Sequence, residues 1–385
     1  MKKIYLALLI STLALFLRTY MAYNGPIEYD ESIYINAAAH YNNDMRQGNW
    51  DQIIRSSENI EHPQFYKLVY ATGLFAAEPL QNDISLAEGY NIQSVSWWHK
   101  FLGLRMISAL LGTAATFLIS MVSPWAGLFL AINTYMIKYT SVVYLEALPA
   151  LTSLVALLTA QQALMNFQNH PKKRISWIAF LILSALSLGM TAASKYIYAL
   201  IGFVIVIDIL VRGRKQIILT LAGLAIWGLL SIFFFFLFDP VLWHSPLTAL
   251  MNSINYNTSY AVGQHVLEVS YPFWQPIKWL SISIPQWPNN PIAFFINKGD
   301  YFICADTLIF VLALMGIPGL FKKNKTMLLW LLIGLGFLLA WGTKWPQYIL
   351  VIMVPYCVSA AYGVDVLRKL LINHAHIMQQ QKAPL

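Results

Sequence analysis

Repeated apolar runs are the feature that most constrains what this chain can fold into. A helix needs roughly 20 apolar residues to cross the hydrocarbon core of a bilayer. Runs of spanning length lie at residues 4–22, 101–121, 124–140, 143–165, 175–192, 196–211, 216–238, 302–320, 326–342 and 346–366. The pattern predicts an all-α polytopic membrane protein with about ten transmembrane helices.

The composition also indicates a membrane protein. Hydrophobic residues make up 58% of the chain and charged residues only 11%, a more apolar balance than soluble domains have. The net charge of +8 could suggest a nucleic acid partner. However, Lys and Arg fall in short clusters between the apolar runs, as they do in cytoplasmic loops. We therefore expect membrane lipid around the chain and no nucleic acid partner.

The N-terminal run could be read in two ways. Lys2 and Lys3 precede an apolar stretch from Ile4 to Leu17, which also describes a signal peptide. No convincing small-x-small cleavage site follows, and many more spans come after it. We expect an uncleaved first transmembrane helix.

Basic clusters predict the topology. Clusters at 172–174 and 212–215 bracket one apolar stretch and both favour the cytoplasm, so the stretch should be a hairpin that turns outside near 189–195. Further clusters at 322–325 and 368–369 also belong inside. Both termini are then expected in the cytoplasm.

Two long outer loops remain, at residues 23–100 and 239–300. The first should hold two short helices along the membrane surface, at 31–42 and 63–77, where apolar residues recur with helical spacing. Pro63 suits the first turn of the second of these helices.

We expect residues 1–372 to form one module and residues 373–385 to form a disordered cytoplasmic tail.

Ionisable side chains gather at one predicted depth, the outer interface. Charges within a membrane cost about 2.5–3.5 kcal/mol each on insertion scales, so their positions are informative. The set comprises Asp30, Glu31, Arg105, Lys138, Glu146, Lys195 and Lys344. The middle of the membrane has no obvious acid or base of the kind that ion-coupled transporters place there. The set favours chemistry on a lipid head group, and the alternative for each residue is a helix-end charge held by snorkelling and local ion pairs.

Asp30 and Glu31 stand immediately outside the first span and open a helix. Asp30 could simply cap that helix. It could instead act as a carboxylate base that takes the proton of an acceptor hydroxyl as this attacks a sugar C1.

The order of motifs adds a family resemblance. Asp30-Glu31 is followed by Glu61-His62-Pro63 and then by Arg105-x-x-Ser108-Ala-Leu-x-Gly112, with weaker matches at Glu146 and 189–195. This order resembles the glycosyltransferase-C superfamily, specifically its protein O-mannosyltransferase-like and aminoarabinose-transferase-like enzymes. The resemblance covers residues 1–200 best. Close relatives usually have a second proline where this chain has Gln64, and often Asp where it has Glu146.

The resemblance implies a fold, a reaction and roles for residues. It implies a glycosyltransferase-C fold, a polyprenyl-phosphate-linked sugar donor and an inverting transfer whose catalytic carboxylate is Asp30. Glu61 and His62 match a segment that lines the family's site, although a loop turn held by Pro63 is an alternative. Arg105 and Lys195 would bind the donor phosphate, since both donate to oxyanions. Lys344 is a further candidate for this contact, and Glu31 and Glu146 complete the expected substrate-binding set.

The sequence leaves open whether the protein binds a divalent metal ion. The chain has no Asp-x-Asp sequence, so the metal–diphosphate grip of many nucleotide-sugar enzymes is missing. Carboxylate and imidazole sets can bind zinc, and the side chains that could face the outer site are Asp30, Glu61, His62, His244 and His265. Without a tight spacing motif, a solvated or hydrogen-bonded histidine is the alternative reading for each.

We therefore expect a glycosyltransferase in the plasma (inner) membrane of a prokaryote, acting outside the cytoplasm on a glycan, lipid or protein acceptor. The alternative is a transporter or flippase that binds a lipid-linked sugar without breaking its phosphate bond.

The first prediction concerns topology. Reporter fusions after Arg174, Arg214 and Lys325 should report cytoplasm, and fusions near Asn49 and Asn257 should report the outside, because basic loops stay inside. A cytoplasmic Asn49 would contradict the scheme, since the acidic loop would then lie on the wrong side of the membrane.

Overall fold

The computed structural model describes residues 2–55, 57–76, 86, 88–169, 174–284 and 305–381. These residues form helices and short 3₁₀ turns without a β-strand, and one isolated bridge joins Pro26 to Asn91. The α-helices are α1 (Lys2–Asn24), α2 (Glu31–Gln47), α3 (Trp50–Arg55), α4 (Phe65–Gly73), α5 (Trp98–Val122), α6 (Pro124–Ile132), α7 (Thr134–Tyr139), α8 (Ala147–Asn169), α9 (Arg174–Ser194), α10 (Ile201–Gly213), α11 (Ile217–Phe238), α12 (Val241–His244), α13 (Pro246–Ala261), α14 (Gln264–Val269), α15 (Gln275–Ser281), α16 (Ala305–Lys323), α17 (Lys325–Ala340) and α18 (Met353–Gln381). The predicted all-α fold class is confirmed.

The helices that could cross a membrane can be compared with the ten predicted spans. In the described parts of the chain, 7 helical segments are long and apolar enough to cross a membrane. One of them, Tyr196–Phe238, contains both α10 and α11, and Lys325–Ala340 is a shorter apolar helix. The chain is a multi-pass membrane protein, and the predicted count of ten is not confirmed.

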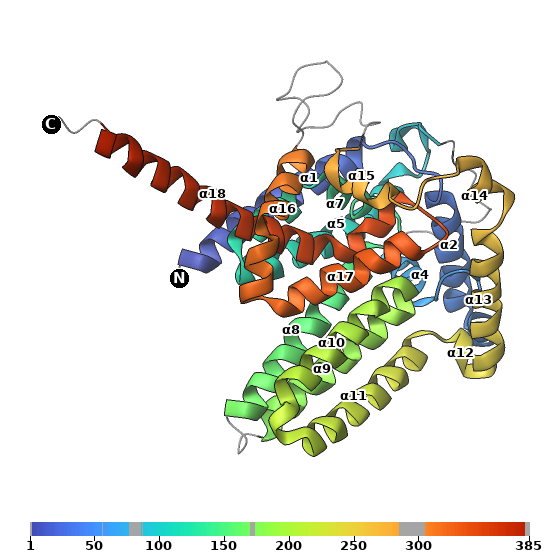
Figure 1. The fold of residues 1–385 in the computed structure, drawn as a ribbon. Helices are drawn as coiled ribbons and strands as arrows, with labels where there is room; N and C mark the ends of the chain where they lie inside the picture. Colours follow the sequence, from blue (N-terminus) through green and yellow to red (C-terminus); the bar gives the residue numbers. More distant parts are fainter. Residues whose placement is uncertain are drawn as a thin grey trace.

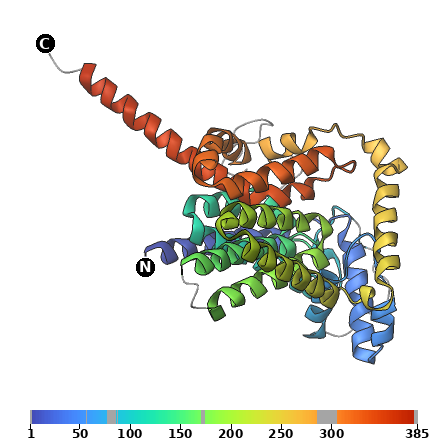
Figure 2. The same cartoon turned by 60° about the horizontal axis from the view of Figure 1, so that its bottom comes forward.

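The two outer loops meet at one end of the molecule. Helices α2 and α4 of the first loop and α12, α13 and α14 of the second lie together at the right of Figure 1, whereas both termini lie at the left. Figure 2 shows the same separation from another side. Segments far apart in the sequence therefore share one face of the bundle.

The predicted span 124–140 is broken in the middle. Asn133 has extended backbone and separates α6 from α7, and its side chain accepts a hydrogen bond from the backbone N–H of Met136 at 2.9 Å. The next predicted span, 143–165, begins only at Ala147. Residues 140–146 are irregular and buried, which is tolerated at membrane depth only where protein surrounds the backbone.

The predicted hairpin is present. Helix α9 runs to Ser194, and the chain turns at Lys195 and the 3₁₀ turn Tyr196–Leu200 before α10 begins. The turn thus starts at the last residue of the predicted range 189–195. The basic residues 172 and 173 lie outside the described residues.

Both helices expected in the first outer loop are also present. Helix α2 covers the predicted 31–42, and α4 with the 3₁₀ turn Leu74–Ala76 covers most of 63–77. Helices α12 to α15 in the second loop were not predicted, because short helices without a clear apolar period leave little trace in sequence.

The C-terminal segment differs from the predicted disordered tail. Helix α18 continues to Gln381 and extends away from the rest of the molecule (Figures 1 and 2). No Gly or Pro follows Gly363 before residue 384 to end the helix. Residues 382–385 lie outside the described residues.

Small residues allow helices α16 and α18 to pack closely against each other. A Cβ atom on Gly316 would lie 1.7 Å from the backbone oxygen of Ser359, and one on Gly363 would lie 1.9 Å from that of Leu312. The Ser359 hydroxyl also donates to the Ala313 carbonyl at 2.7 Å. Small residues of this kind let backbones approach in membrane proteins, where apolar burial gives little preference for protein over lipid.

This packing generates the second prediction. Gly363→Ala should lower thermal stability by about 1–3 kcal/mol, because the added methyl group meets backbone that cannot move aside. Gly336→Ala is the control, since nothing lies within 4 Å of a Cβ there. Equal melting temperatures of the two variants in detergent would contradict the close backbone contact.

Candidate functional site

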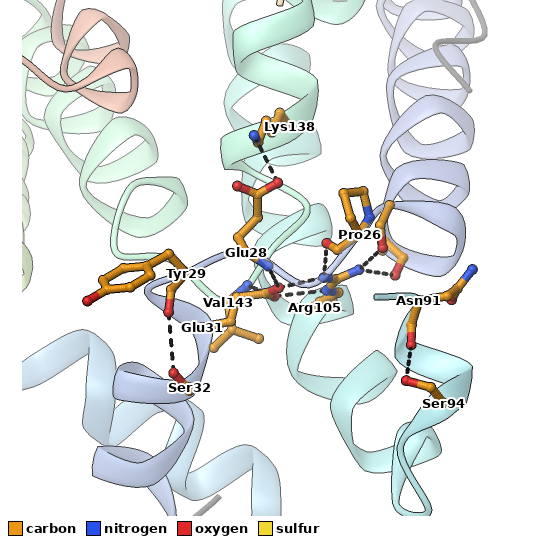
Figure 3. A network of polar contacts seen from close by, with 12 residues as sticks. Pro26, Glu28, Tyr29, Glu31, Ser32, Asn91, Ser94, Arg105, Lys138 and Val143 are labelled. Atoms are coloured by element: carbon orange, nitrogen blue, oxygen red, sulfur yellow. Dashed lines mark hydrogen bonds and ion pairs between the residues drawn. The ribbon is translucent and has the colours of Figure 1, made fainter. Parts of the chain in front are cut away.

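A buried ion pair between Glu31 and Arg105 joins the first outer loop to α5. Arg105 donates from Nε to Glu31 Oε1 at 2.8 Å and from Nη2 to Oε2 at 2.5 Å, and both side chains are 0% exposed. The carboxylate also accepts the backbone N–H groups of Glu28 at 2.9 Å and Val143 at 2.8 Å. Figure 3 shows this network. One pair therefore fixes the loop after α1, the start of α2 and the irregular segment before α8.

Arg105 is fully engaged inside the protein. Beyond Glu31, its Nη1 donates to the carbonyl oxygens of Ala22 at 3.0 Å and Gly25 at 2.9 Å, and Nη2 donates to that of Pro26 at 2.7 Å. These contacts use all of the N–H groups of a guanidinium. The polar atoms of Arg105 and Glu31 therefore satisfy one another and the backbone in this structure, and their predicted roles as substrate contacts stay predictions.

The rest of the Arg105 motif is explained by the same face of α5. Ser108 contacts the hydroxyl groups of Tyr66 at 3.1 Å and Tyr70 at 2.6 Å, both on α4. At Gly112 a Cβ atom would lie 2.4 Å from the Thr140 hydroxyl. Because these positions recur at helical spacing, the motif holds the outer helices and the segment after α7 against the bundle.

Asp30 occupies the N-cap position of α2 without capping the helix. Its side chain makes no capping hydrogen bond, so the simple capping role is not seen. The residue is half-buried. Burial raises the pKa of Asp30 to about 7, Lys195 opposes this rise, and the negative charges of Glu146, Glu61 and Glu28 add to it. Asp30 thus lies among the acids and the lysine that the sequence singled out.

Glu146 and Lys195 form a second buried ion pair. Lys195 Nζ donates to Glu146 Oε1, and the two side chains are 2% and 0% exposed respectively. Glu146 Oε2 is buried without a hydrogen-bond partner among the described residues. The Lys195 ammonium also lies 5.2 Å from the centre of the Tyr348 ring. Unlike Arg105, this cation keeps donor capacity, because an ammonium carries three N–H groups.

Glu61 and His62 are placed by a buried lysine that sequence reasoning missed. Lys67 on α4 is 0% exposed and donates to the carbonyl oxygens of Glu58, of Asn59 at 3.0 Å and of His62 at 2.8 Å. Burial lowers the pKa of His62 well below its usual value, and Lys195 and Lys67 lower it further. His62 is therefore a neutral imidazole at pH 7, and Glu61 Oε1 lies 3.8 Å from its Nε2.

Tyrosines that were not predicted line the same region. Tyr34 and Tyr144 are buried, and their ring centres lie 5.8 Å apart. The Tyr139 ring follows at 5.6 Å from Tyr144, and His62 lies 6.2 Å from Tyr34. The cluster joins α2, residues 139–144 and the loop that holds His62, so no local sequence pattern could reveal it.

Gln64, which stands where relatives usually have proline, connects the two outer loops. Its backbone N–H donates to Asp239 Oδ1 at 3.1 Å, and its side-chain oxygen accepts the N–H of Val241 at 3.0 Å. Asp239 is 0% exposed. Asp239 comes directly after an apolar run, and Asp30 was chosen from the sequence because it follows one too. The same criterion could therefore have identified Asp239.

The remaining lysines of the predicted set have local contacts. Lys138 forms an ion pair with Glu28 at 2.8 Å (Figure 3), as the structural alternative expected. Lys344 is buried and donates to the carbonyl oxygens of Trp341 and, at 3.2 Å, Leu339. No carboxylate in the described part of the chain lies within 4.0 Å of its ammonium group.

Two further observations modify the sequence analysis. Arg18 is a fully buried arginine inside α1 that donates to the Thr140 hydroxyl at 2.8 Å, and the sequence analysis did not select it. Across the described ranges, no group of three or more His, Cys, Asp or Glu side chains is positioned to hold a metal ion. The divalent metal considered from the sequence therefore has no such ligand set there.

Comparison with known proteins places this arrangement in a known fold. Neither a protein-family model nor a curated protein sequence matches the chain. Among solved structures, ArnT from Cupriavidus metallidurans bound to undecaprenyl phosphate is similar with a TM-score of 0.60 and 14% identity, over 96% of this chain and 63% of that one. The oligosaccharyltransferase of Archaeoglobus fulgidus in its apo form is similar with a TM-score of 0.56 and 13% identity, over 100% of this chain and 52% of that one. The chain thus spans between half and two thirds of these proteins, and the predicted glycosyltransferase-C fold is confirmed.

The third prediction separates a structural Arg105 from a phosphate-binding one. Arg105→Ala should cost about 3–5 kcal/mol of stability, because it leaves the buried Glu31 carboxylate unpaired. Arg55→Ala is the matched control and should cost less than about 1 kcal/mol, because the Arg55–Asp51 pair is exposed, at 55% and 75%. Thermal unfolding in detergent measures both. A normally stable Arg105→Ala protein that no longer binds undecaprenyl phosphate would restore the phosphate role.

Proposed function

We propose that this protein transfers a sugar with inversion from a polyprenyl-phosphate donor to an acceptor hydroxyl at the extracytoplasmic face of the membrane. The observation that carries the proposal is the position of Asp30, an uncapped, half-buried carboxylate beside the Glu146–Lys195 pair. The fold shared with ArnT and the oligosaccharyltransferase supports it.

Asp30 is the proposed general base. A base works best when its pKa is close to the working pH, and burial raises the pKa of Asp30 to about 7. The carboxylate takes the proton of the acceptor hydroxyl while that oxygen attacks C1 of the donor sugar. The C1–O bond to the phosphate breaks, and the polyprenyl phosphate leaves with the bonding electrons.

Lys195 and Lys344 are the proposed contacts for the donor phosphate. Arg105 has no N–H group left to offer, whereas Lys195 donates to one carboxylate and Lys344 donates only to neutral carbonyl oxygens. The phosphodiester of the donor is a monoanion, and its negative charge would compensate Lys344, which has no carboxylate partner within the described chain. Ammonium groups bind phosphate as point charges, and they would stabilise the negative charge that develops on the leaving oxygen.

Glu61 and His62 are the proposed positioning groups for the acceptor. The charge of Glu61 raises the pKa of Asp30, and Lys67 holds the backbone carbonyl of His62. A neutral imidazole can donate from one nitrogen and accept at the other, which suits a hydroxyl group. Glu146 holds Lys195 and completes the charge balance near Asp30.

The proposal also includes the membrane in which the protein acts and its orientation there. The protein acts in the plasma (inner) membrane of a prokaryote, with its outer loops outside and both termini in the cytoplasm. That both termini lie at the end opposite these loops supports this orientation (Figure 1).

The fourth prediction tests the base. Asp30→Asn keeps the size of the side chain, so the protein should fold and bind undecaprenyl phosphate normally, while turnover falls by about 10²-fold or more. Turnover is measured as release of undecaprenyl phosphate from a panel of undecaprenyl-phosphate-linked sugars, and mass spectrometry of cells should show the natural donor accumulating. An active Asp30→Asn with an inactive Glu61→Gln would move the base to Glu61. Donor binding without turnover in the wild type would indicate a transporter.

The fifth prediction concerns pH. The base must be ionised, and its pKa of about 7 means that acid removes the active form. Turnover should therefore rise as the pH passes through about 7. One pH unit below the pKa, the rate should be roughly tenfold lower than its plateau at high pH. The residual rate of Asp30→Asn should not follow this curve. A wild-type rate that is flat from about pH 6 to 8 would rule out an Asp30 of this pKa.

A further inference from the structure

A cavity of about 190 Å³ lies between the two outer loops. Residues of the first loop, among them Ser57 and His62, form one wall. Helices α12 and α13 of the second loop form the other, with Leu242, Thr248 and Asn252. Hydroxyl, amide and imidazole groups thus alternate with aliphatic surface.

Asp239 gives this cavity a specific polar group. The residue lines the cavity and is 0% exposed, and its Oδ1 accepts the backbone N–H of Gln64. Its Oδ2 is buried and has no hydrogen-bond partner among the described residues. A buried oxygen of this kind costs free energy unless a ligand or water satisfies it. Burial raises the pKa of Asp239 to about 7, so the group can accept or donate a hydrogen bond near neutral pH.

The cavity adjoins the candidate site. His62 lines it and also lies against Tyr34, one turn into the helix that Asp30 begins. Tyr196 lines it as well and follows Lys195 directly in the chain. A molecule seated in the cavity would therefore extend past His62 toward the proposed base and phosphate contacts.

The size and chemistry of the cavity limit the class of ligand that it can bind. At about 190 Å³ it is smaller than the roughly 300–1,000 Å³ of sites for drug-sized ligands, so it suits one ring rather than a long chain. A phosphate group would meet the Asp239 carboxylate, and the one cation among the lining residues, Arg55, already binds Asp51 at 2.8 Å. A lipid tail would bury the polar wall without hydrogen bonds. A sugar ring matches both surfaces, because its hydroxyl groups donate and accept while its C–H faces are apolar.

We propose that this cavity binds a sugar unit of the acceptor, with Asp239 Oδ2 accepting a hydrogen bond from one of its hydroxyl groups. The inference rests on the proposed transferase function and narrows its acceptor to a glycan or glycolipid. It assigns Asp239 to substrate binding, away from the reacting atoms.

The test uses the full chain in lipid nanodiscs and a panel of methyl hexosides and pentosides as probes. Saturation-transfer NMR should detect at least one glycoside on the wild type. Asp239→Asn keeps an oxygen for the Gln64 N–H but replaces the free acceptor, and it should weaken that binding about tenfold or more, as for a lost hydrogen bond to a charged group. Ala249→Phe should abolish it by filling the cavity from α13.

Controls separate this inference from the proposed function. Met251→Phe places the same ring on α13 at a 54% exposed position and should bind glycosides like the wild type. All variants should bind undecaprenyl phosphate normally, which also shows that they fold. The inference is overturned if no glycoside binds, or if binding survives unchanged in either Asp239→Asn or Ala249→Phe. If undecaprenyl phosphate itself fails to bind the wild type, the proposed function fails instead.

Discussion

The end of this protein at which the two long loops meet depends on the buried pair of Glu31 and Arg105. Two opposite charges without contact to water are expensive unless every polar atom is satisfied. Here the carboxylate accepts two backbone N–H groups besides the guanidinium, and the guanidinium donates to three carbonyl oxygens. These bonds come from several segments, so the pair sets their relative positions. Asp30 precedes Glu31 directly, and its location therefore follows from a contact that involves no substrate.

A count of donors distinguishes structural cations from available ones. Arg105 and Lys67 are both 0% exposed and have their N–H groups directed at protein oxygens. Lys195 and Lys344 are also buried but keep unused N–H groups or uncompensated charge. Since a buried ammonium gains from any additional acceptor, an anionic ligand at either of these two lysines would stabilise the structure. Sequence position alone cannot make this distinction.

The sequence predicted the class of fold, the hairpin at Lys195 and two outer-loop helices, because apolar length and basic clusters are local signals with direct physical causes. It also brought Asp30, Glu146 and Lys195 to one depth. It did not reveal what tertiary contacts decide: the break at Asn133, the partners of Arg105, and buried groups such as Lys67. An arginine that opens a span looks the same in sequence whether a phosphate or a glutamate lies opposite. Only the partner from a distant segment decides which it is.

The two acids with a pKa near 7, Asp30 and Asp239, differ in what surrounds them. Asp30 lies among other acids and a lysine with donors to spare, so a reacting phosphate ester would find compensating charge there. Asp239 lies among hydroxyl and amide groups of the cavity, with one oxygen committed to Gln64. The segment that holds Glu61 and His62 adjoins both acids, and Lys67 fixes it through three carbonyl oxygens. The same segment therefore lies beside the proposed base, Asp30, and beside the proposed sugar contact, Asp239. Because Lys67 holds this segment in place, the distance between the reacting hydroxyl group and the sugar ring bound at Asp239 would stay constant.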